Sequence, residues 1–277
     1  MAAPGTPGAA PDATLVASLQ ALGDELNEAL TAAFARRAEL AVTQKSSAHD
    51  LVSDADRQIE ARVRAFVATR HPDDAFLGEE SGGHPDPLAE RCWVVDPIDG
   101  TMNFVHGMPW ACSSVGVLAH GVALAGIVVA PFSGDLYLCA GAGATRGGER
   151  LSVAPGADLA GAMVLLEVPS GTSPSVLAPV ADAVIEAGGS PRTMGSGALA
   201  LALVAAGVVH GVVHAGPSIW DVAAGVALVE QAGGTVRSVV GPYVLGRPGP
   251  LIAASAPAAE VLAAALARCP EVAGPAS

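Results

Sequence analysis

Two acidic side chains directly follow an apolar segment in the first half of the chain. The segment Trp93–Val95 is apolar throughout, and Asp96 comes next. Such a short run suits a buried strand. Pro97 cannot donate to a sheet and biases Asp96 away from helix, so we expect the strand to end at Asp96. Asp99 lies three residues later, which places two carboxylates at one strand end.

The residues after this acid pair add main-chain donors to the carboxylates. Gly100 permits a tight approach or a positive φ, and Thr101 can cap the element that follows. Carboxylate and carbonyl oxygens are the ligands that Mg²⁺ takes, and exposed N–H groups bind phosphate. Asp-Gly is also common in ordinary turns, but a turn alone does not explain two acids against an apolar strand. The pattern therefore predicts a site for hard cations and an anion.

A second acidic pair repeats this arrangement earlier in the chain. Ala75–Leu77 predicts a strand, and it runs through a glycine into Glu79 and Glu80. Taken alone, these two acids would form a solvated loop. Taken with Asp96 and Asp99, they offer a third acid for a cluster of metal ions.

Three segments of the chain resemble the signatures of the inositol monophosphatase family. Residues 93–106 read W-V-V-D-P-I-D-G-T-M-N-F-V-H, which is similar to the first signature, W-V-[IV]-D-P-[IL]-D-G-T-x-N-F-x-H. Residues 220–234 read W-D-V-A-A-G-V-A-L-V-E-Q-A-G-G and resemble the second, and G-E-E-S at 78–81 matches the acidic element. All three lie in the expected order, which argues against a chance match.

The resemblance implies a set of metal ligands. Asp96, Asp99, Asp221 and the main-chain carbonyl of Ile98 would hold Mg²⁺, with Glu79 sharing one ion. Two or three ions would occupy the site. A pair of ions about 3.5–4 Å apart can clamp the attacking and leaving oxygens of an in-line displacement. Each ion also lowers the pKa of its bound water.

The resemblance also implies residues that act on the water. Glu79 and Thr101 would orient and deprotonate it, and Asp56 would accept the hydroxyl hydrogen of Thr101. Lys45 and Asp50 match the same family element as Asp56, which reads D-L-V-[TS]-x-x-D. The products would be an alcohol and inorganic phosphate, with no covalent phosphoenzyme.

The resemblance is less informative about the substrate, a small phosphorylated metabolite. Inositol-specific relatives usually carry Glu where this chain has His214, and Met102 replaces a usual Thr. Inositol 1-phosphate, histidinol phosphate, fructose 1,6-bisphosphate and nucleotide bisphosphates therefore stay open as substrates. The residues that would contact phosphate or the rest of the substrate are Gly100, Thr101, Ser170, Gly195, Ser196, Gly197, His214 and Asp221.

The composition describes an acidic protein with a core of small apolar residues. Hydrophobic residues make up 51% of the 277 residues but aromatic residues only 4%, so the core must use Ala, Val and Leu. The net charge of −13 argues against a nucleic-acid or anionic-membrane surface. The negative charge also disfavours binding of a phosphate ester, unless divalent cations make the electrostatic potential at the site positive.

Targeting and redox signals are sparse. The first residues have neither a basic region nor an apolar core of a signal peptide, and no run of 18 apolar residues occurs. The four cysteines form no C-x-x-C pair, so we expect free thiols in a reducing compartment. We therefore expect a cytoplasmic location and no membrane partner.

Periodicity predicts an α/β protein with an α+β first half. Leucines repeat at helical spacing over Leu15–Phe34, and a second helix should begin after Ser53. We expect a disordered tail at 1–12, a half at 13–150 that carries most metal ligands, and a half at 151–277 that carries Asp221 and substrate contacts. The resemblance implies a layered αβαβα sandwich, like that of fructose-1,6-bisphosphatase, and a homodimer.

Three other functions fit parts of the pattern. Haloacid-dehalogenase phosphatases carry D-x-D-G-T with a nucleophilic first Asp, whereas this chain has D-x-x-D-G-T. An EF-hand would need a D-x-[DN]-x-[DN]-G loop with a closing Glu, which is missing. A non-catalytic phosphatase-like binding domain would not need every metal-ligand position to keep its acid. Lithium inhibition, which the resemblance implies, would further separate these classes.

Overall fold

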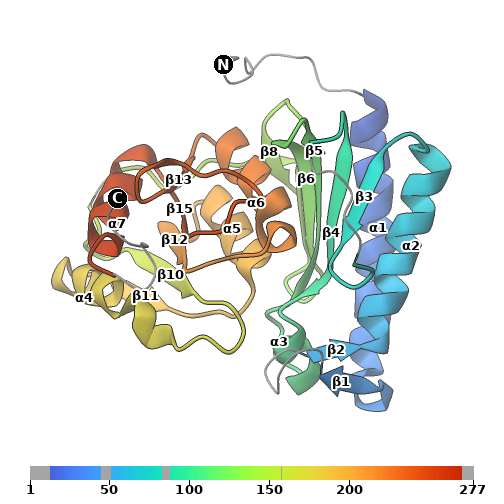
Figure 1. Cartoon of the computed structure of the whole chain (residues 1–277), viewed down its shortest axis with the longest axis horizontal. Helices are drawn as coiled ribbons and strands as arrows, with labels where there is room; N and C mark the ends of the chain where they lie inside the picture. Colours follow the sequence, from blue (N-terminus) through green and yellow to red (C-terminus); the bar gives the residue numbers. More distant parts are fainter. Residues whose placement is uncertain (1–12, 45–50, 83–87, 157, 270–277) are drawn as a thin grey trace.

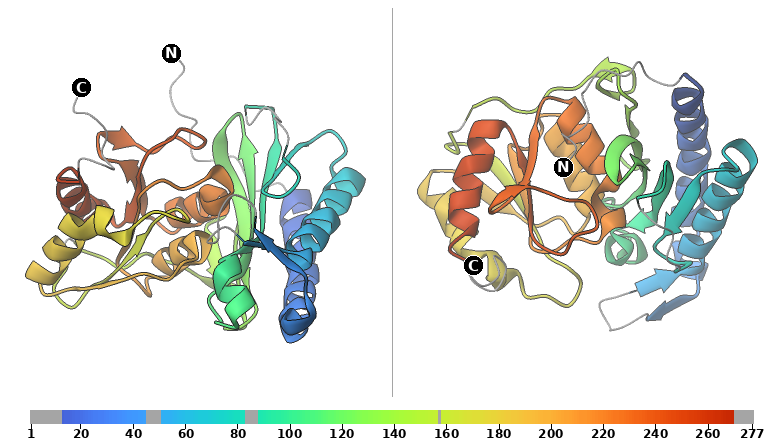
Figure 2. Two further views of the ribbon diagram at one scale, coloured as in Figure 1. Left: turned by 60° about the horizontal axis from the view of Figure 1, so that its bottom comes forward. Right: turned by 45° about the horizontal axis from the view of Figure 1, so that its top comes forward.

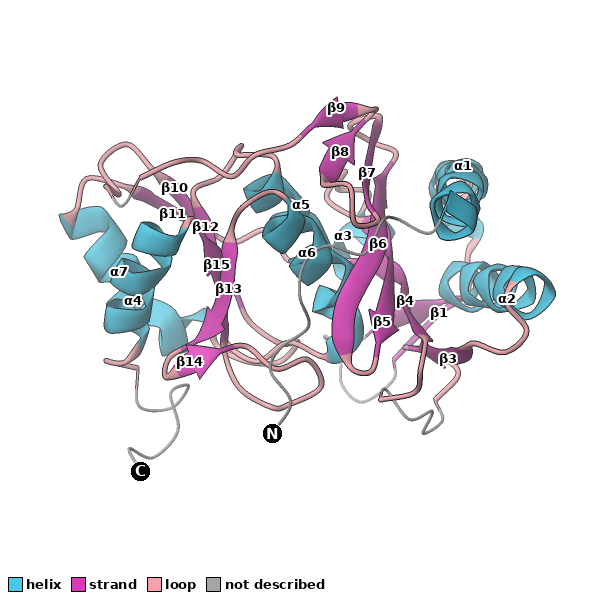
Figure 3. Cartoon of the chain, turned by 90° about the horizontal axis from the view of Figure 1, so that it is seen from above, coloured by secondary structure: helices cyan, strands magenta, loops and turns pink. Residues whose placement is uncertain are grey.

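The described chain folds into five alternating layers of helices and sheets (Figure 3). The computed structural model describes residues 13–44, 51–82, 88–156 and 158–269. The tail expected at 1–12, Lys45 and Asp50 lie outside the described residues. The layering confirms the predicted αβαβα sandwich. None of the helices in the described part of the chain is both long and apolar enough to cross a membrane.

Two outer helices, which run antiparallel to each other, cover one face of the first sheet (Figure 1). Helix α1 (Ala13–Ala35) buries its leucines at the predicted spacing. Helix α2 (Asp54–Arg70) begins at Ser53, whose hydroxyl accepts the N–H of Ala55 while Asp56 accepts the N–H of Ser53. This reciprocal capping fixes the first turn of α2 and leaves the Asp56 carboxylate fully buried.

The first sheet is a mostly antiparallel meander in the order β3-β4-β5-β6-β7-β8-β9. Only the β3·β4 pair is parallel. A hairpin joins β5 to β6 through His120 and Gly121, which both have positive φ as a tight turn requires. The strand bounds are β3 Ala75–Gly78, β4 Cys92–Asp99, β5 Cys112–Ala119, β6 Val122–Ala130, β7 Asp135–Cys139, β8 Ala144–Arg146 and β9 Glu149–Arg150.

Strand β4 corrects one prediction from the sequence. We expected it to end at Asp96, but it continues through Pro97 to Asp99. The register against β5 shifts between Asp96 and Asp99, so the strand bulges where Pro97 cannot donate. The Ser113 hydroxyl donates to the Pro97 carbonyl at 2.6 Å and holds the bulge in place. The chain then enters the short helix α3 (Thr101–His106), beside the hairpin of β1 (Val42–Gln44) and β2 (Leu51–Ser53).

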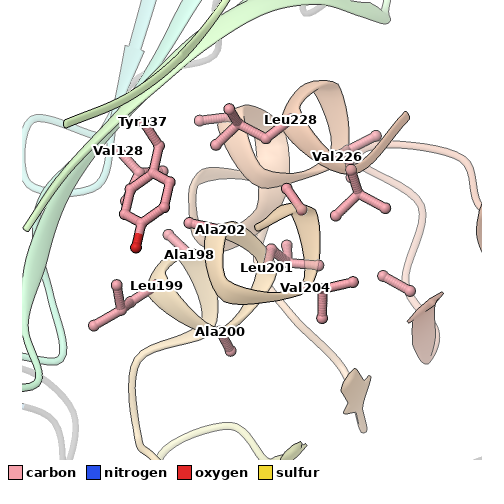
Figure 4. Packing of buried hydrophobic residues seen from close by; sticks show 14 of the residues in the cluster. Val128, Tyr137, Ala198, Leu199, Ala200, Leu201, Ala202, Val204, Val226 and Leu228 are labelled. Carbon is pink, nitrogen blue, oxygen red and sulfur yellow. The ribbon is translucent and has the colours of Figure 1, made fainter. Parts of the chain in front are cut away.

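The central layer consists of α5 (Gly197–Ala205) and α6 (Ile219–Gln231), which lie between the two sheets (Figure 3). Their apolar side chains pack in one cluster with Val128 and Tyr137 of the first sheet (Figure 4). Almost every residue of α5 is buried, as its apolar sequence predicts. Small residues allow α6 to approach the first sheet closely. A Cβ on Gly116 would lie 2.6 Å from the Cβ of Ala223, so this helix–sheet contact depends on glycine.

The second sheet is mixed, in the order β11-β10-β12-β15-β13-β14. Strand β10 pairs in parallel with β11 and β12, whereas β15 pairs antiparallel with β12 and β13. Helices α4 (Ala178–Glu186) and α7 (Ala256–Leu266) cover its outer face (Figure 2). The strand bounds are β10 Met163–Glu167, β11 Ser190–Arg192, β12 Gly211–His214, β13 Thr235–Ser238, β14 Gly241–Pro242 and β15 Leu251–Ala254. Two short 3₁₀ helices, η1 (Arg37–Glu39) and η2 (Pro174–Leu177), complete the described elements.

Candidate active site

A pocket of about 600 Å³ gathers residues from both sheets and from the central helices. Nearly every candidate residue from the sequence lines it. Asp56 is the exception, and it lies behind Thr101, with which it shares a long hydrogen bond. The candidate residues that line the pocket are Glu79, Asp96, Ile98, Asp99, Gly100, Thr101, Ser170, Gly195, Ser196, Gly197, His214 and Asp221.

Four carboxylates from three elements form what we call the acid wall: Glu79, Asp96, Asp99 and Asp221. Glu79 directly follows β3, and its N–H donates to the carbonyl of Val95 on β4, which brings the two strand ends together. Asp96 and Asp99 lie on β4, and Asp221 lies in the first turn of α6. Three segments far apart in sequence therefore contribute to one wall.

Asp96 lies at the centre of the acid wall and is strongly perturbed. It is 3% exposed, it shares a hydrogen bond with Glu79, and its Oδ1 atom has no hydrogen-bond partner. Burial, followed by repulsion from Glu79, Asp99 and Asp221, raises the pKa of Asp96 well above its usual value. A buried oxygen without a donor among like charges is unfavourable unless a cation supplies the missing partner.

Asp99 has a second role that the sequence did not indicate. Its carboxylate accepts the Ser196 hydroxyl and the main-chain N–H groups that begin α5. The bonds from the N–H groups of Gly197 and Ala198 are 3.1 and 2.9 Å long. Asp99 thus ties β4 to the N-terminus of α5, a favourable place for a negative charge.

These bonds change how the Gly195–Gly197 turn should be interpreted. The family resemblance implied that the Gly195–Gly197 turn contacts the substrate. The N–H groups of Gly197 and Ala198 instead donate to Asp99. Oδ1 of Asp99 accepts only the Gly197 bond among those found, so this oxygen keeps a lone pair that faces no described donor.

Thr101 and Asp56 lie close to their expected partners, with one difference. The Thr101 hydroxyl lies 2.9 Å from the Ile98 carbonyl and 3.5 Å from Asp56 Oδ1. Both partners can only accept, so the single hydroxyl hydrogen favours the shorter bond to Ile98. Asp56 is more tightly held by Ser53, whose N–H and hydroxyl donate to it at 2.8 and 2.6 Å.

Asp221 also contributes to local structure. Its Oδ2 atom accepts the N–H of Ser218 at 2.8 Å, within the capping box that begins α6. The Ser-x-x-Asp spacing is a recognised capping signal that the sequence already carried. The Asp221 side chain also lines the pocket.

A second wall of the pocket contains His214 and a residue that sequence reasoning missed, Glu167. They are paired across β10 and β12, and both are buried and line the pocket. Burial lowers the pKa of His214 to about 4, so the ring is neutral near pH 7. Burial raises the pKa of Glu167 to about 7, although the N–H groups of Met194 and Gly195 donate to it. The sequence signal that could have identified Glu167 is its position as a single acid directly after the apolar run Met163–Leu166.

The tautomer of His214 follows from its main-chain contact. The N–H of Gly216 donates to Nδ1 at 3.3 Å, so Nδ1 is the acceptor and Nε2 carries the hydrogen. Nε2 lies on the side of Gly197, where a Cβ would be 3.5 Å away. His214 can therefore donate to an oxygen in the pocket, in contrast to the carboxylates around it.

Glu60 is a second residue that the sequence did not single out for the site. It lies one turn after Asp56 on α2, is 3% exposed, and its Oε2 atom accepts the N–H of Glu80 at 2.7 Å. A Cβ on Gly78 would collide with its carboxylate. Glu60 therefore holds the loop that presents Glu79, and the glycine of G-E-E-S is explained by this close approach.

The acid wall fits a divalent cation by its donor chemistry. In the described part of the chain, no three His, Cys, Asp or Glu side chains already converge as a metal-binding group. This is consistent with mutual repulsion and with the bonds that draw Asp99 toward α5. The unpartnered Oδ1 of Asp96 and the oxygen-only ligand set suit Mg²⁺ rather than a softer metal.

Comparison with known proteins identifies a family. The model of the inositol monophosphatase family matches residues 12–271. An inositol-1-monophosphatase of Mesorhizobium japonicum is 36% identical to this chain, over 69% of this chain and 73% of its own length. A Nus factor SuhB of Pasteurella multocida is 34% identical, over 80% of this chain and 84% of its own.

Solved structures show the same architecture. The extragenic suppressor protein SuhB of Bartonella henselae has a TM-score of 0.85 and 28% identity, and the match covers 92% of this chain and 98% of that one. An IMPase of Thermotoga maritima has a TM-score of 0.79 and 26% identity, with coverage of 94% and 98%. The five-layer fold is therefore that of the family whose signatures the sequence resembles.

Proposed function

Since this chain belongs to the inositol monophosphatase family and is a phosphoric monoester hydrolase, we propose that it cleaves small phosphate monoesters with the help of Mg²⁺ bound at the acid wall. The observation that carries the metal assignment is Asp96. Its buried Oδ1 atom has no partner, and three other carboxylates raise its pKa. A cation at this point would satisfy the oxygen and remove the repulsion.

The proposed ligands are the side chains of Asp96, Asp99 and Asp221 and the carbonyl of Ile98, with Glu79 at the edge. When bound, Mg²⁺ would act as a Lewis acid toward the phosphate oxygens and the attacking water. It would also invert the field of a protein whose net charge is −13, so that a phosphate ester can enter.

The protein's own groups would then position the water and take its proton. Glu79 is the proposed base, and Glu60 holds the main chain that follows it. Thr101 would orient the water through its hydroxyl oxygen, because its hydrogen points to the Ile98 carbonyl or Asp56. The main-chain N–H groups of Gly100 and Thr101 are the proposed phosphate contacts. General acid–base assistance of this kind is worth about 10²–10⁴ in rate.

The leaving alcohol would lie toward the wall of Glu167, His214 and Ser170. Neutral His214 donates through Nε2, so it pairs best with an acceptor oxygen of the substrate. A carboxylate in its place would instead need a hydroxyl donor. Inositol 1-phosphate, histidinol phosphate, fructose 1,6-bisphosphate and nucleotide bisphosphates stay as candidate substrates, and His214 is the residue that should rank them.

A phosphate-release panel over these esters, with Mg²⁺ and with excess chelator, tests the proposal. We expect release from at least one ester with Mg²⁺, none with chelator, and inhibition by Li⁺. Asp96→Asn serves as the inactive control on the same fold. Full activity in chelator would remove the metal assignment, and activity that survives high Li⁺ would remove only the lithium expectation.

We also propose that the chain acts as a homodimer, as the family resemblance implies. Met108 and Trp110, which follow α3 near the pocket, are 39% and 44% exposed and give this surface an apolar character. Light scattering at micromolar concentration should give twice the chain mass of 27.3 kDa. A mass of one chain would contradict the proposal.

A further inference from the structure

The turn at Met194–Gly195 is held by side chains from two different elements, strand β10 and helix α3. Glu167 on β10 accepts the N–H groups of Met194 and Gly195 at 2.8 and 2.9 Å. Asn103 on α3 donates its amide hydrogens to the carbonyls of Trp110 and Met194, at 2.8 and 2.9 Å, and lies 3.3 Å from the carbonyl of Gly195. The turn therefore has its N–H groups fixed by one half of the chain and its carbonyls fixed by the other.

The backbone of this turn has little freedom to choose another shape. Gly195 has a φ of +75°, a left-handed value that favours glycine, and a Cβ there would lie 3.4 Å from the Asn103 amide nitrogen. Ser196 follows directly and begins α5. The position of the turn therefore sets the position of the first residues of α5.

Those first residues of α5 hold Asp99. The Ser196 hydroxyl and the Gly197 N–H donate to the Asp99 carboxylate, and both lie immediately after the turn. A path of direct hydrogen bonds thus leads from Glu167 through the turn to a proposed Mg²⁺ ligand in the other half of the chain. Charged hydrogen bonds such as those of Glu167 are stronger than neutral ones.

The burial of Glu167 favours a specific role over a surface one. Its side chain is 2% exposed, yet no basic side chain is paired with it among the described residues. The pKa of Glu167 is raised to about 7 by burial, which shows that its two N–H donors offset only part of the cost. A buried acid kept at such a cost is a candidate for positioning rather than stability.

We propose that Glu167 is a positioning residue that works with Asn103 to clamp the Met194–Gly195 turn, and that this clamp sets the Asp99 carboxylate for Mg²⁺. The proposal rests on the metal role of Asp99 in the proposed function. The clamp itself, however, is a property of the protein alone, and it can be measured without the metal.

The first test measures the clamp in metal-free protein. Hydrogen exchange of the Met194 and Gly195 amides should be slow in the wild type and at least tenfold faster in Glu167→Gln and Glu167→Ala. Glu230→Gln, a carboxylate of the same half that lies outside the pocket, is the matched control and should leave both amides unchanged. Equal exchange rates in the wild type and the Glu167 variants would overturn the clamp.

The second test measures Mg²⁺ affinity by calorimetry without substrate. Glu167→Ala should weaken binding by roughly tenfold, the scale of one lost charged hydrogen bond, and Asn103→Ala by less. The double variant should lose less Mg²⁺-binding free energy than the sum of the losses in the two single variants, because both side chains hold the same turn.

The outcomes separate this inference from the proposed function. A wild type that binds no Mg²⁺ refutes the metal assignment, while hydrogen exchange still decides the clamp. Wild-type Mg²⁺ binding that is unchanged in folded Glu167 variants refutes the link to Asp99. If Glu167→Ala does not fold, Glu167→Gln and Asn103→Ala provide the same comparison, since Asn103 approaches the turn from the other side.

Discussion

The two walls of the pocket each contain a buried carboxylate with a raised pKa, but their surroundings differ. Asp96 on the acid wall faces three other acids and keeps one oxygen without a partner. Glu167 on the second wall has a main-chain N–H donor for each oxygen. Both are nearly inaccessible to solvent. The same chemical group is thus left open for a cation at one place and used as an anchor at the other.

This contrast teaches that burial and a perturbed pKa do not by themselves distinguish a ligand from an anchor. Burial is the first cause of the raised pKa in both residues. What differs is whether hydrogen-bond donors of the protein already satisfy the oxygens. Asp99 combines the two situations, since it belongs to the acid wall while N–H groups of α5 already donate to it.

The largest effect should come from neutralising the acid wall. Asp96→Asn should abolish turnover, a loss of at least about a thousandfold, because it removes an anionic metal ligand. The same change should raise the melting temperature of the metal-free protein, since it relieves repulsion from three acids. Phosphate release and thermal melts with and without Mg²⁺ measure both effects. Asp221→Asn is the matched variant and should also abolish turnover.

A retained kcat in Asp96→Asn would contradict the proposed role of the acid wall. A lower melting temperature of the metal-free variant would show that the carboxylate is already stabilised by protein groups. The comparison between Asp96 and Glu167 would then lose its basis.

A smaller loss is expected from Thr101→Ala, which removes a water-orienting hydroxyl and leaves the carboxylates in place. The kcat should fall on the order of a hundredfold, the lower end for one acid–base element. The Mg²⁺ affinity should change little, and calorimetry can check this independently. Thr101→Ser keeps the hydroxyl and should recover most of the activity. A Thr101→Ala variant that loses Mg²⁺ binding would instead place Thr101 among the residues that hold the metal.

On the second wall, His214→Glu should change substrate preference and leave the metal site intact. It replaces the Nε2–H donor with acceptors, so esters that present hydroxyl groups should gain. We expect kcat/KM for inositol 1-phosphate to rise about tenfold relative to glycerol 2-phosphate. His214→Gln, which can still donate, is the control and should shift this ratio less. An unchanged ratio would move the specificity argument to Ser170 and Gly197.

The smallest effect on activity, and the most direct comparison of the walls, concerns pH and Glu167. Burial in the folded state raises the pKa of Glu167 from 4.5 to about 7. Between these pH values the folded state therefore binds a proton that the unfolded state has lost. Stability from this group is therefore greatest below about pH 4.5 and is lost as the pH rises toward 7. The free energy of unfolding that is lost over this pH range is at most about 3 kcal/mol, since one pKa unit corresponds to about 1.36 kcal/mol.

Glu167→Gln should remove this slope, because Gln does not titrate. Denaturant melts of metal-free protein between pH 4.5 and 7.5, compared between wild type and variant, isolate the contribution of Glu167. Parallel curves for the wild type and Glu167→Gln would mean that the N–H donors already stabilise the charged form.

Local patterns in the sequence were sufficient to predict the first helices and to identify the acidic residues of the site. The leucine spacing of α1 and the Ser53 cap of α2 each depend on residues a few positions apart, and both are observed. The acid pair on β4 and its neighbour Glu79 were recognised from strand ends and from the family signatures. These features depend on short-range chemistry that a chain carries wherever it folds.

The tertiary structure alone decided what each carboxylate does. Asp99 bonds to residues 97 to 100 positions further along the chain, and Glu167 bonds to the turn 27 and 28 positions away. Strand β4 passed Pro97 because the pairing with β5 continued beyond the bulge. No local pattern encodes such partners, because the donors that reach a carboxylate depend on how distant segments of the chain pack together. The sequence by itself determined which side chains are acidic and that several of them follow apolar strand residues, whereas the packing of two sheets around α5 and α6 determined which carboxylate oxygens lack a donor from the protein.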